Sequence, residues 1–394
     1  MFHSYTFRNF QSFRESTHVS LELNNKTPTR GWEANSASGK RLSTALAVLG
    51  ANGAGKTAML KPLAFAAWFM GQSFAAGPDS AIPVTPHFSG KGEPTEIEVE
   101  AEDVEGVTWR YVLAVTEKHV VHEALYRKKE RFGYVFVRDW DESSQTYSIK
   151  QQGFGLAPNE ARKVRPNASL ISTALQYGVE LAKHITSFNL ESNVTFMGRM
   201  DFQMSQLHLA AQFFAAHEPL REQMAGLLRR WDLGLSDVVV RELNLPAEDG
   251  KTRNVLTTFG MHATRDGNTA ELLMEQESSG TQSAYVLLSR ILAVLESGGI
   301  ALIDEIENDL HPHMVEPVLD LFANPATNPR HAQLLFTCHS PEVLDLLQKA
   351  QVMFVEKVDC ESIAFRGDDI QGLRSDDNLR AKYMAGALGA VPLF

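Results

Sequence analysis

The residues with the most definite chemistry are Gly50-Ala51-Asn52-Gly53-Ala54-Gly55-Lys56-Thr57. They match the pattern G-x-x-x-x-G-K-[ST], whose glycines let successive backbone N–H groups point at phosphate oxygens. Lys56 would place its charge at the β- and γ-phosphates, and the Thr57 hydroxyl would be a ligand for Mg²⁺. The competing interpretation is a glycine-rich turn with a chance lysine. The pattern predicts a nucleoside triphosphate site that is formed by Gly50, Asn52, Gly53, Ala54, Gly55, Lys56 and Thr57.

Such a loop acts between a strand and a helix, and the flanking residues predict both. Ala45 to Leu49 is an apolar run typical of a strand, and Ala58 to Met70 is compatible with a helix. The N-terminus of that helix would add unpaired N–H groups and a favourable dipole to the anion site. Pro62 lacks a backbone donor, so we expect it to kink the helix.

Two adjacent carboxylates, Asp304 and Glu305, follow the apolar run Gly299 to Ile303. The chain turns at a strand end, so both side chains can face a nucleotide there. Asp304 would then hold Mg²⁺ through water, and Glu305 would orient or deprotonate the water that attacks the γ-phosphate. Alone, the run would also fit a strand capped by two solvated acids. Its place downstream of a phosphate-binding loop favours the catalytic interpretation.

A third group is Ser278-Ser279-Gly280-Thr281-Gln282, at the predicted start of a helix that continues to Leu295. A helix N-terminus offers free N–H groups and a positive dipole end, which suit an anion. A plain helix cap would have the same local sequence. Both interpretations stay open on the residues alone.

The order of these motifs resembles the ATPase heads of the ABC superfamily, in the branch that contains the SMC, Rad50, RecF and OLD proteins. In this comparison Ser278 to Gln282 takes the place of the LSGGQ signature. Asp304 to Pro312 (DEIENDLHP) is similar to the Walker B and D-loop segments, with His311 in the LHP part. Leu335 to Pro341 (LFTCHSP) resembles the switch-histidine segment, and Phe7 to Phe13 the first strand of these heads.

Within this branch, the chain is most similar to the small stand-alone bacterial ATPases called AAA15 or RloA-like. Their C-terminal segments resemble Asn378 to Tyr383 and Gly386 to Pro392. The signature lacks the usual leading Leu and second Gly, and no glutamine is assigned to the Q-loop position.

The resemblance implies an ATPase that converts ATP and water to ADP and phosphate, with ATP and Mg²⁺ as cofactors. The catalytic residues would be Glu305, His339 and Lys56, with His339 sensing the γ-phosphate. Thr57 and Asp304 would be the metal ligands. Two heads would enclose two ATP molecules in a homodimer or higher oligomer. Ser279 and Gly280 of one subunit would contact the γ-phosphate held by Lys56 of the other.

The expected fold is α/β: an ABC-type P-loop ATPase head with a mixed central sheet, an antiparallel β meander and a helical insertion. Residues 1–157 are predicted to form the N-terminal lobe with the meander, 158–235 the helical insertion, and 236–394 the C-terminal lobe. Alternating residues place the meander's strands between Glu96 and Ile149. The predicted helices of the insertion are Ala168 to His184, Met204 to Ala216 and Glu218 to Trp231. Asn24 to Lys40 is expected to be a loop, and Val352 to Val355 the last strand.

The composition is that of an ordinary globular protein, with 394 residues, 44% hydrophobic and 22% charged. A net charge of −11 argues against broad coating of DNA by this chain. Two cysteines are too few for a disulfide framework. No signal peptide is visible and no apolar stretch approaches the roughly 20 residues of a membrane span. The expected protein is soluble and cytoplasmic, with no membrane contact.

The resemblance gives the first functional hypothesis, an ATP-driven switch. Such heads often serve bacterial defence against phage and control a separate effector protein, a toxin or a nuclease. The insertion between Asn167 and Trp231 is the expected place of client contact. The sequence does not distinguish ATP from GTP by a base-reading motif.

Three other classes of function are alternatives to the switch. A RecF-like DNA-repair ATPase would bind duplex DNA, with its best basic cluster at Arg127, Lys128, Lys129 and Arg131 and a second at Arg162, Lys163 and Arg165. A scaffold that does not hydrolyse its nucleotide would have no need of Glu305. A transport ATPase is disfavoured by the lack of a membrane segment.

Overall fold

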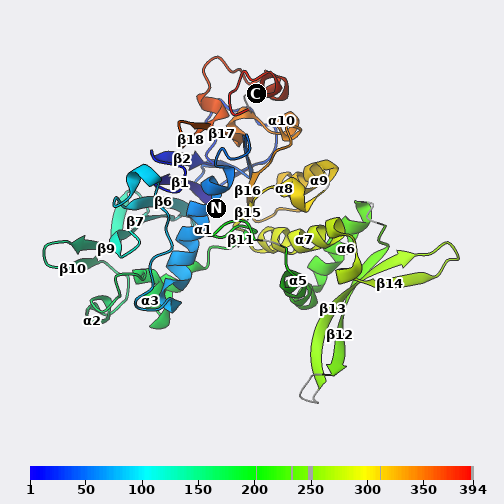
Figure 1. The fold of residues 1–394 in the computed structure, drawn as a ribbon, viewed down its shortest axis with the longest axis horizontal. Coiled ribbons are helices and arrows are strands. Elements are labelled where there is room, and N and C mark those ends of the chain that lie inside the picture. The colour runs from blue at the N-terminus through cyan, green and yellow to red at the C-terminus, as the bar shows by residue number, and fades with distance from the viewer. Residues whose placement is uncertain (201, 232–233, 247–251, 311, 392–394) are drawn as a thin grey trace.

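The computed structural model describes residues 1–200, 202–231, 234–246, 252–310 and 312–391. Its centre is a six-stranded sheet (Figure 1). In spatial order the strands are β11 (Leu190–Ser192), β15 (Ile300–Ile303), β16 (Gln333–Thr337), β5 (Ala45–Gly50), β17 (Val352–Val358) and β18 (Glu361–Arg366). The first five are parallel, and β18 runs antiparallel to β17. The carboxyl ends of β5, β15 and β16 therefore meet at one edge, where ligands bind in open α/β sheets.

A second, seven-stranded sheet is fully antiparallel and contains the predicted meander. Its order is β10 (Thr146–Gln151), β9 (Phe132–Asp141), β8 (Val120–Lys128), β7 (Thr108–Val115), β6 (Thr95–Glu102), β1 (Phe2–Arg8) and β2 (Thr17–Ser20). Buried and exposed positions alternate along much of β6 and β7, which is the pattern of a sheet with one face on a core.

Helix α1 (Lys56–Gln72) lies between the two sheets. One hydrophobic cluster joins Phe65 of α1 to Phe7 and Leu113 of the antiparallel sheet and to Leu46 and Leu335 of the central sheet. Two short helices of the insertion, α3 (Leu170–Gln176) and α4 (Glu180–Thr186), contribute to the same cluster. A further turn of helix, α2 (Pro158–Ala161), precedes them.

The opposite face of the central sheet is covered by the remaining helices, and their apolar faces form a second cluster. They are α5 (Met204–Ala216), α6 (Glu218–Arg230), α7 (Ser279–Ser297), α8 (Ile306–Asp309), α9 (Pro312–Ala323), α10 (Val343–Leu346) and α11 (Leu379–Met384). Neighbouring residues of one strand face different clusters: Val48 of β5 belongs to the first and Leu49 to the second. The central sheet is therefore the shared wall of two cores.

Two small sheets complete the fold. One is the pair β3 (Glu33–Asn35) and β4 (Arg41–Ser43). The other is the antiparallel sheet of β12 (Asp237–Pro246), β13 (Thr252–Ala263) and β14 (Thr269–Leu273). Figure 1 shows this sheet projecting from the body beyond α5 and α6.

Most predicted elements are confirmed, including the strand and helix around the phosphate-binding pattern. Helix α1 continues past Pro62 to Gln72, longer than expected. Helices α5 and α6 agree with their predicted ranges within one residue.

Four predictions of secondary structure were wrong. The helix over Ala168 to His184 is two helices, because Gly178 adopts a φ of 70° between them. The predicted loop Asn24 to Lys40 contains β3. The insertion predicted to be helical, residues 158–235, contains β11, which joins the central sheet. Val352 to Val355 is not the last strand, since β18 follows it. The division at 157 and 235 stays a prediction.

Candidate functional site

The phosphate-binding pattern forms the turn from β5 into α1. Gly55 is the N-cap of α1 with a φ of 117°, and Gly53 has a φ of 75°. Only glycine adopts such conformations easily, so the loop can present its backbone N–H groups on one side. A Cβ on Gly55 would also lie 2.5 Å from Ser362 Oγ. Asn52 and Gly53 are exposed at the tip, whereas Ala54 is buried, its carbonyl accepting a hydrogen bond from Ser362 Oγ.

Lys56 is 6% exposed at the start of α1. Its Nζ donates to the carbonyls of Gly50 (2.9 Å) and Ala51 (3.2 Å) and lies 3.3 Å from His339 Nδ1. Burial lowers the pKa of this ammonium, an effect opposed by the carboxylates of Glu305, Glu307 and Asp304. The loop thus holds a desolvated cation above its own carbonyls, which is the charge that a phosphate group requires.

Asp304 follows β15 and is 1% exposed. Its Oδ2 accepts a hydrogen bond from Thr57 Oγ1 (2.9 Å), and its Oδ1 accepts one from Thr337 Oγ1 (2.7 Å). The Thr337 hydroxyl also accepts from the backbone N–H of Glu305 at 2.7 Å. Thr337, the last residue of β16, therefore ties the two carboxylate residues together. Thr337 was not predicted from the sequence to be a site residue.

Asn193 was also not identified from the sequence. It is buried directly after β11, and its side-chain amide pairs with both backbone groups of Asp304. Asn193 Nδ2 donates to the carbonyl of Asp304 (3.0 Å), and Asp304 N donates to Asn193 Oδ1 (2.7 Å). The only signal available in the sequence was an asparagine after a three-residue strand that is itself hard to predict.

Glu305 adopts the left-handed conformation, with φ 52° and ψ 60°. This conformation is unusual for a residue with a long side chain, and such outliers are concentrated at functional sites. One carboxylate oxygen lies 3.4 Å from His339 Nε2, and the other lies 3.7 Å from Arg199 Nη1 and accepts from Asn308 Nδ2 at 2.6 Å. Glu305 is about one-third exposed, so water can reach it.

His339 lies just after β16, where the sequence predicted it. Its backbone N donates to Glu307 Oε1 at 2.5 Å, which fixes the loop that carries it. The imidazole lies between Lys56 and Glu305, in contact distance of both. Lys56, Thr57, Asp304, Glu305 and His339 are thus brought together at the carboxyl edge of the central sheet.

Ser279 and Gly280 are not part of this group. Both are exposed at the first turn of α7, where Ser278 caps the helix by accepting from Thr281 N at 3.2 Å. Among the described residues, no hydrogen bond or ion pair links them to the phosphate-binding loop. Helix α7 packs on the opposite face of the central sheet from α1.

The oxygen donors beside the loop fit Mg²⁺. Hard cations of this kind prefer hydroxyl and carboxylate oxygens and keep several waters. Thr57 Oγ1 and Asp304 Oδ2 supply one donor of each kind, within 2.9 Å of each other. Glu307, two residues after Glu305, has a buried Oε2 that makes no hydrogen bond to the residues that the structure describes.

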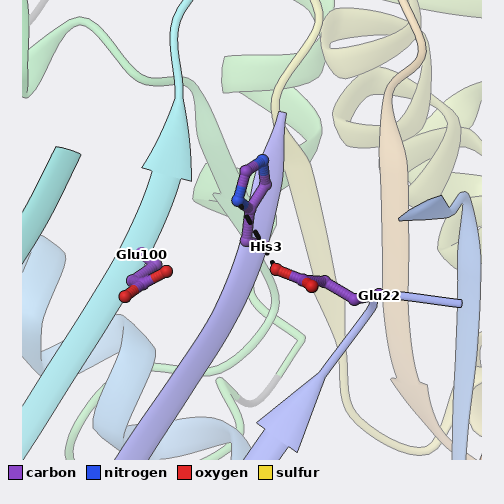
Figure 2. Close-up of side chains that lie close together, drawn as sticks. All are labelled: His3, Glu22 and Glu100. Carbon is purple, nitrogen blue, oxygen red and sulfur yellow. Dashed lines mark ion pairs between the residues drawn. The ribbon is translucent and has the colours of Figure 1, made fainter. Parts of the chain in front are cut away.

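A second cluster of ligand-type atoms spans β6, β1 and the residues that follow β2, as Figure 2 shows for Glu100, His3 and Glu22. These atoms lie within 4.8 Å of one another. However, Lys40 Nζ pairs with Glu22 and lies 3.3 Å from His3 Nδ1, and Arg110 Nε donates to Glu100 at 2.6 Å. Two cationic side chains already neutralise the carboxylates, so this cluster is a network of ion pairs.

Of the predicted basic clusters, the first covers the end of β8 and the turn into β9, with Arg127, Lys129 and Arg131 exposed. In the second, Lys163 pairs with Glu160 at 2.9 Å and Arg165 donates to the carbonyl of Phe74. His311 and Pro392, which carried part of the resemblance, lie outside the described residues. Within the part of the chain that the structure describes, no helix combines the length and apolar character that crossing a membrane needs.

Known proteins resemble this chain at the level of family and fold. No curated protein matches it. Residues 46–345 match the family model AAA_21, "AAA domain, putative AbiEii toxin, Type IV TA system". A solved structure titled "Crystal structure of the SmcHead bound to the C-winged helix domain of ScpA" has a TM-score of 0.50 and 12% identity, over 93% of this chain and 97% of that one.

Two further solved structures are less similar. The SMC head domain from Thermotoga maritima has a TM-score of 0.41 and 14% identity, over 93% of this chain and 98% of that one. The recombination mediator protein RecF, solved as RecF-ATPrS, has a TM-score of 0.36 and 11% identity, over the same shares. The fold is that of an ABC/SMC-type ATPase head, as expected. Because the family model covers most of the chain, the protein belongs to the AAA_21 family of AAA-domain proteins.

Proposed function

We propose that this protein binds and hydrolyses ATP with Mg²⁺, and that it acts as a molecular switch. The observation that carries this proposal is the convergence of Lys56, Thr57, Asp304, Glu305 and His339 at one edge of the central sheet. This set contains a cation for the phosphates, oxygen donors for a metal ion, and a carboxylate that water can reach. Membership of an ATPase family supports the same conclusion.

The residues would divide the chemistry as follows. The loop from Gly50 to Gly55 and the Lys56 ammonium would hold the β- and γ-phosphates. Thr57 and Asp304 would hold Mg²⁺, which supplies charge neutralisation at the phosphates when bound. Glu305 would accept a proton from the attacking water, and His339 would hydrogen-bond the γ-phosphate oxygens from the same subunit.

The proposal includes a dimer or higher oligomer that closes around ATP. Ser279 and Gly280 are exposed at the N-terminus of α7, a helix of 19 residues, where N–H groups can bind an anion. They make no polar contact with the phosphate-binding loop of their own chain in the described residues. A second subunit would bring its α7 to this loop, and hydrolysis would separate the pair.

The switch would control a separate effector protein, a toxin or a nuclease, in bacterial defence against phage. Two findings support a partner protein. The family description names a toxin–antitoxin system. The similar SMC head was solved bound to a winged-helix domain of ScpA, so a head of this fold offers a surface to another protein. The part of the insertion from Asn167 to Trp231 would provide the client contact, within the segment 158–235 that separates the two lobes 1–157 and 236–394.

The test compares wild type, Lys56→Ala and Glu305→Gln by ATP hydrolysis and by mass in solution, with and without ATP and Mg²⁺. Glu305→Gln should bind ATP, hydrolyse at least ~100-fold more slowly and accumulate as a dimer. Lys56→Ala should neither hydrolyse ATP nor change mass with nucleotide. If the mass of none of the three proteins responds to ATP, the switch is refuted. The ATPase part of the proposal would then depend on the hydrolysis measurement alone.

A RecF-like ATPase that binds duplex DNA is the second candidate, and the exposed basic side chains of Arg127, Lys129 and Arg131 favour it. Neutralising these residues should then weaken DNA binding and reduce its dependence on salt. The matched control neutralises Lys163 and Arg165, which are held by contacts within the chain. Equal affinity for DNA in all variants, or none in wild type, would exclude this candidate.

A further inference from the structure

The turn that follows β11 lies against the catalytic group, and the catalytic chemistry proposed above assigns no part to its side chains. It runs from Asn193 to Arg199 and closes on itself, with Thr195 N donating to Gly198 O (2.8 Å) and Gly198 N to Thr195 O (3.1 Å). Val194 and Arg199 form an isolated antiparallel bridge across it. The backbone of this turn is therefore well defined up to Arg199.

Contacts with α1 and β15 fix the turn in place. Lys61 Nζ of α1 donates to the carbonyl of Met197 at 3.2 Å. The ring of Phe196 packs on Trp68 of α1, with 4.6 Å between the centroids. At the other end, Asn193 holds both backbone groups of Asp304. These contacts fix the position of the backbone at Arg199.

The Arg199 guanidinium faces the Glu305 carboxylate, with 3.7 Å between Nη1 and Oε2. The other oxygen of Glu305 faces His339 Nε2 at 3.4 Å, and Asn308 donates to Oε2. Arg199 and Glu305 are each about one-third exposed. The carboxylate is thus bounded by an amide, an imidazole and a cation from three separate segments of the chain.

We propose that Arg199 is a positioning residue for Glu305, which it holds in the orientation needed to activate water. This inference rests on the proposed ATPase function. The guanidinium attracts Oε2 of the carboxylate, while His339 faces Oε1, and the two contacts together limit its rotation. Substituting a residue that acts in this way lowers the rate of the chemical step and leaves nucleotide affinity nearly unchanged. Removing a surface ion pair with no catalytic role would change neither the rate nor the affinity.

The first experiment measures ATP hydrolysis and, in EDTA, the affinity for a fluorescent ATP analogue. Arg199→Ala should lower kcat by ~10-fold or more, with KM and analogue affinity within ~3-fold of wild type. Arg199→Lys keeps the charge and should recover much of the loss. Arg221→Ala is the matched control, because among the described residues Arg221 has its ion pair with Glu218, one turn away on α6, and it should behave as wild type.

Free guanidinium separates positioning from packing. Low millimolar guanidinium chloride should raise the rate of Arg199→Ala several-fold, and sodium chloride at equal ionic strength should not. A wild-type kcat in Arg199→Ala would overturn the proposal. Equal losses in Arg199→Ala and Arg199→Lys with no rescue would also overturn it, since they indicate a structural role.

A thermal double-mutant cycle tests the pair without hydrolysis. If wild type hydrolyses no faster than Lys56→Ala, the proposed function fails and the cycle decides the inference by itself. The melting shifts of Arg199→Ala and Glu305→Gln should be non-additive by ~1 °C or more if the two side chains interact. Additive shifts would overturn the inference whatever the activity.

Discussion

The side-chain amide of Asn193 forms two hydrogen bonds with the backbone of Asp304, one to each peptide group. Asn193 N also donates to Leu302 O at 3.2 Å, as the next residue of a strand would. The side chain therefore extends the pairing of β11 with β15 beyond the end of the short strand. This matters because Asp304 stands where the chain leaves the sheet and its backbone would otherwise lose its partners.

We expect Asn193→Ala to lower the free energy of unfolding by ~2 kcal/mol. The substitution leaves a buried N–H and a buried C=O of Asp304 without partners, and each such loss costs about 1–3 kcal/mol. Urea denaturation measures the change. Asn189→Ala is the control, since Asn189 makes an exposed hydrogen bond to Ser297 Oγ (2.8 Å). Equal destabilisation of both variants would contradict the prediction.

Thr337→Val should destabilise the protein by ~2 kcal/mol and slow hydrolysis, although valine has nearly the same shape. The hydroxyl holds both Asp304 and Glu305, so its loss leaves a buried carboxylate oxygen and an N–H unpaired. Thr337→Ser keeps the hydroxyl and should lose under ~1 kcal/mol. Urea denaturation and ATPase rates measure the two effects. A serine variant as impaired as the valine variant would show that the methyl group matters instead.

Substitution by alanine should lower the stability of the protein at Gly50 and raise it at Gly71. A Cβ on Gly50 would lie 2.2 Å from the carbonyl oxygen of Val355 in the neighbouring strand β17, so Gly50→Ala must displace backbone. We expect loss of nucleotide binding and a melting temperature lower by several degrees. A Cβ on Gly71, in the last turns of α1, would meet nothing within 4 Å. Gly71→Ala should raise the free energy of unfolding by ~0.5–1 kcal/mol. Two variants whose melting temperatures are both above, or both below, that of wild type would refute this prediction.

His3 should make the protein less stable in acid. Burial, followed by the nearby Lys40 cation, lowers the pKa of His3 to about 4, although Glu102 and Glu22 oppose this. The unfolded chain, with a pKa of about 6.5, takes up a proton first, so stability is unaffected above pH 6.5 and falls as pH decreases towards 4. On going from pH 7.5 to pH 5, protonation of this histidine in the unfolded chain should lower the free energy of unfolding by ~2 kcal/mol.

The measurement compares urea midpoints of wild type and His3→Gln at the two pH values. Carboxylates titrate in both proteins, so only the difference between their pH dependences reports His3. His18→Gln, at an exposed histidine, should retain the pH dependence of wild type. A His3→Gln variant with the same loss of stability in acid would show that His3 is not responsible.

Much of the site could be predicted because its residues follow strongly apolar strands. β5 and β15 are continuous apolar runs that end in recognisable polar groups, and His339 follows a third such run. Their meeting at one edge follows from the parallel arrangement of the strands.

The elements and site residues that were not predicted have weak signals in the local sequence. β11 consists of Leu-Glu-Ser, and its strand conformation depends on pairing with β15, which only the tertiary fold supplies. The turn before β18 is Asp359-Cys360, with φ values of 50° and 68°. This hairpin lacks the glycine or asparagine that normally marks such a turn, so β18 was not predicted. Asn193 and Arg199 act from a segment whose place beside Asp304 and Glu305 depends on β11.

The position of β5 between β16 and β17 has a consequence for how the protein is made. The phosphate-binding loop leaves the ribosome early, but both strands beside β5 come from the last part of the chain. Even Phe2 is held by the side chain of Gln333, through its N–H (2.6 Å) and its carbonyl (2.9 Å). Long-range pairing of this kind must wait for translation to reach β17 and is slow to form. A nascent or truncated chain that stops before β16 would therefore have the complete phosphate-binding pattern but neither of the two strands that flank β5 in the central sheet.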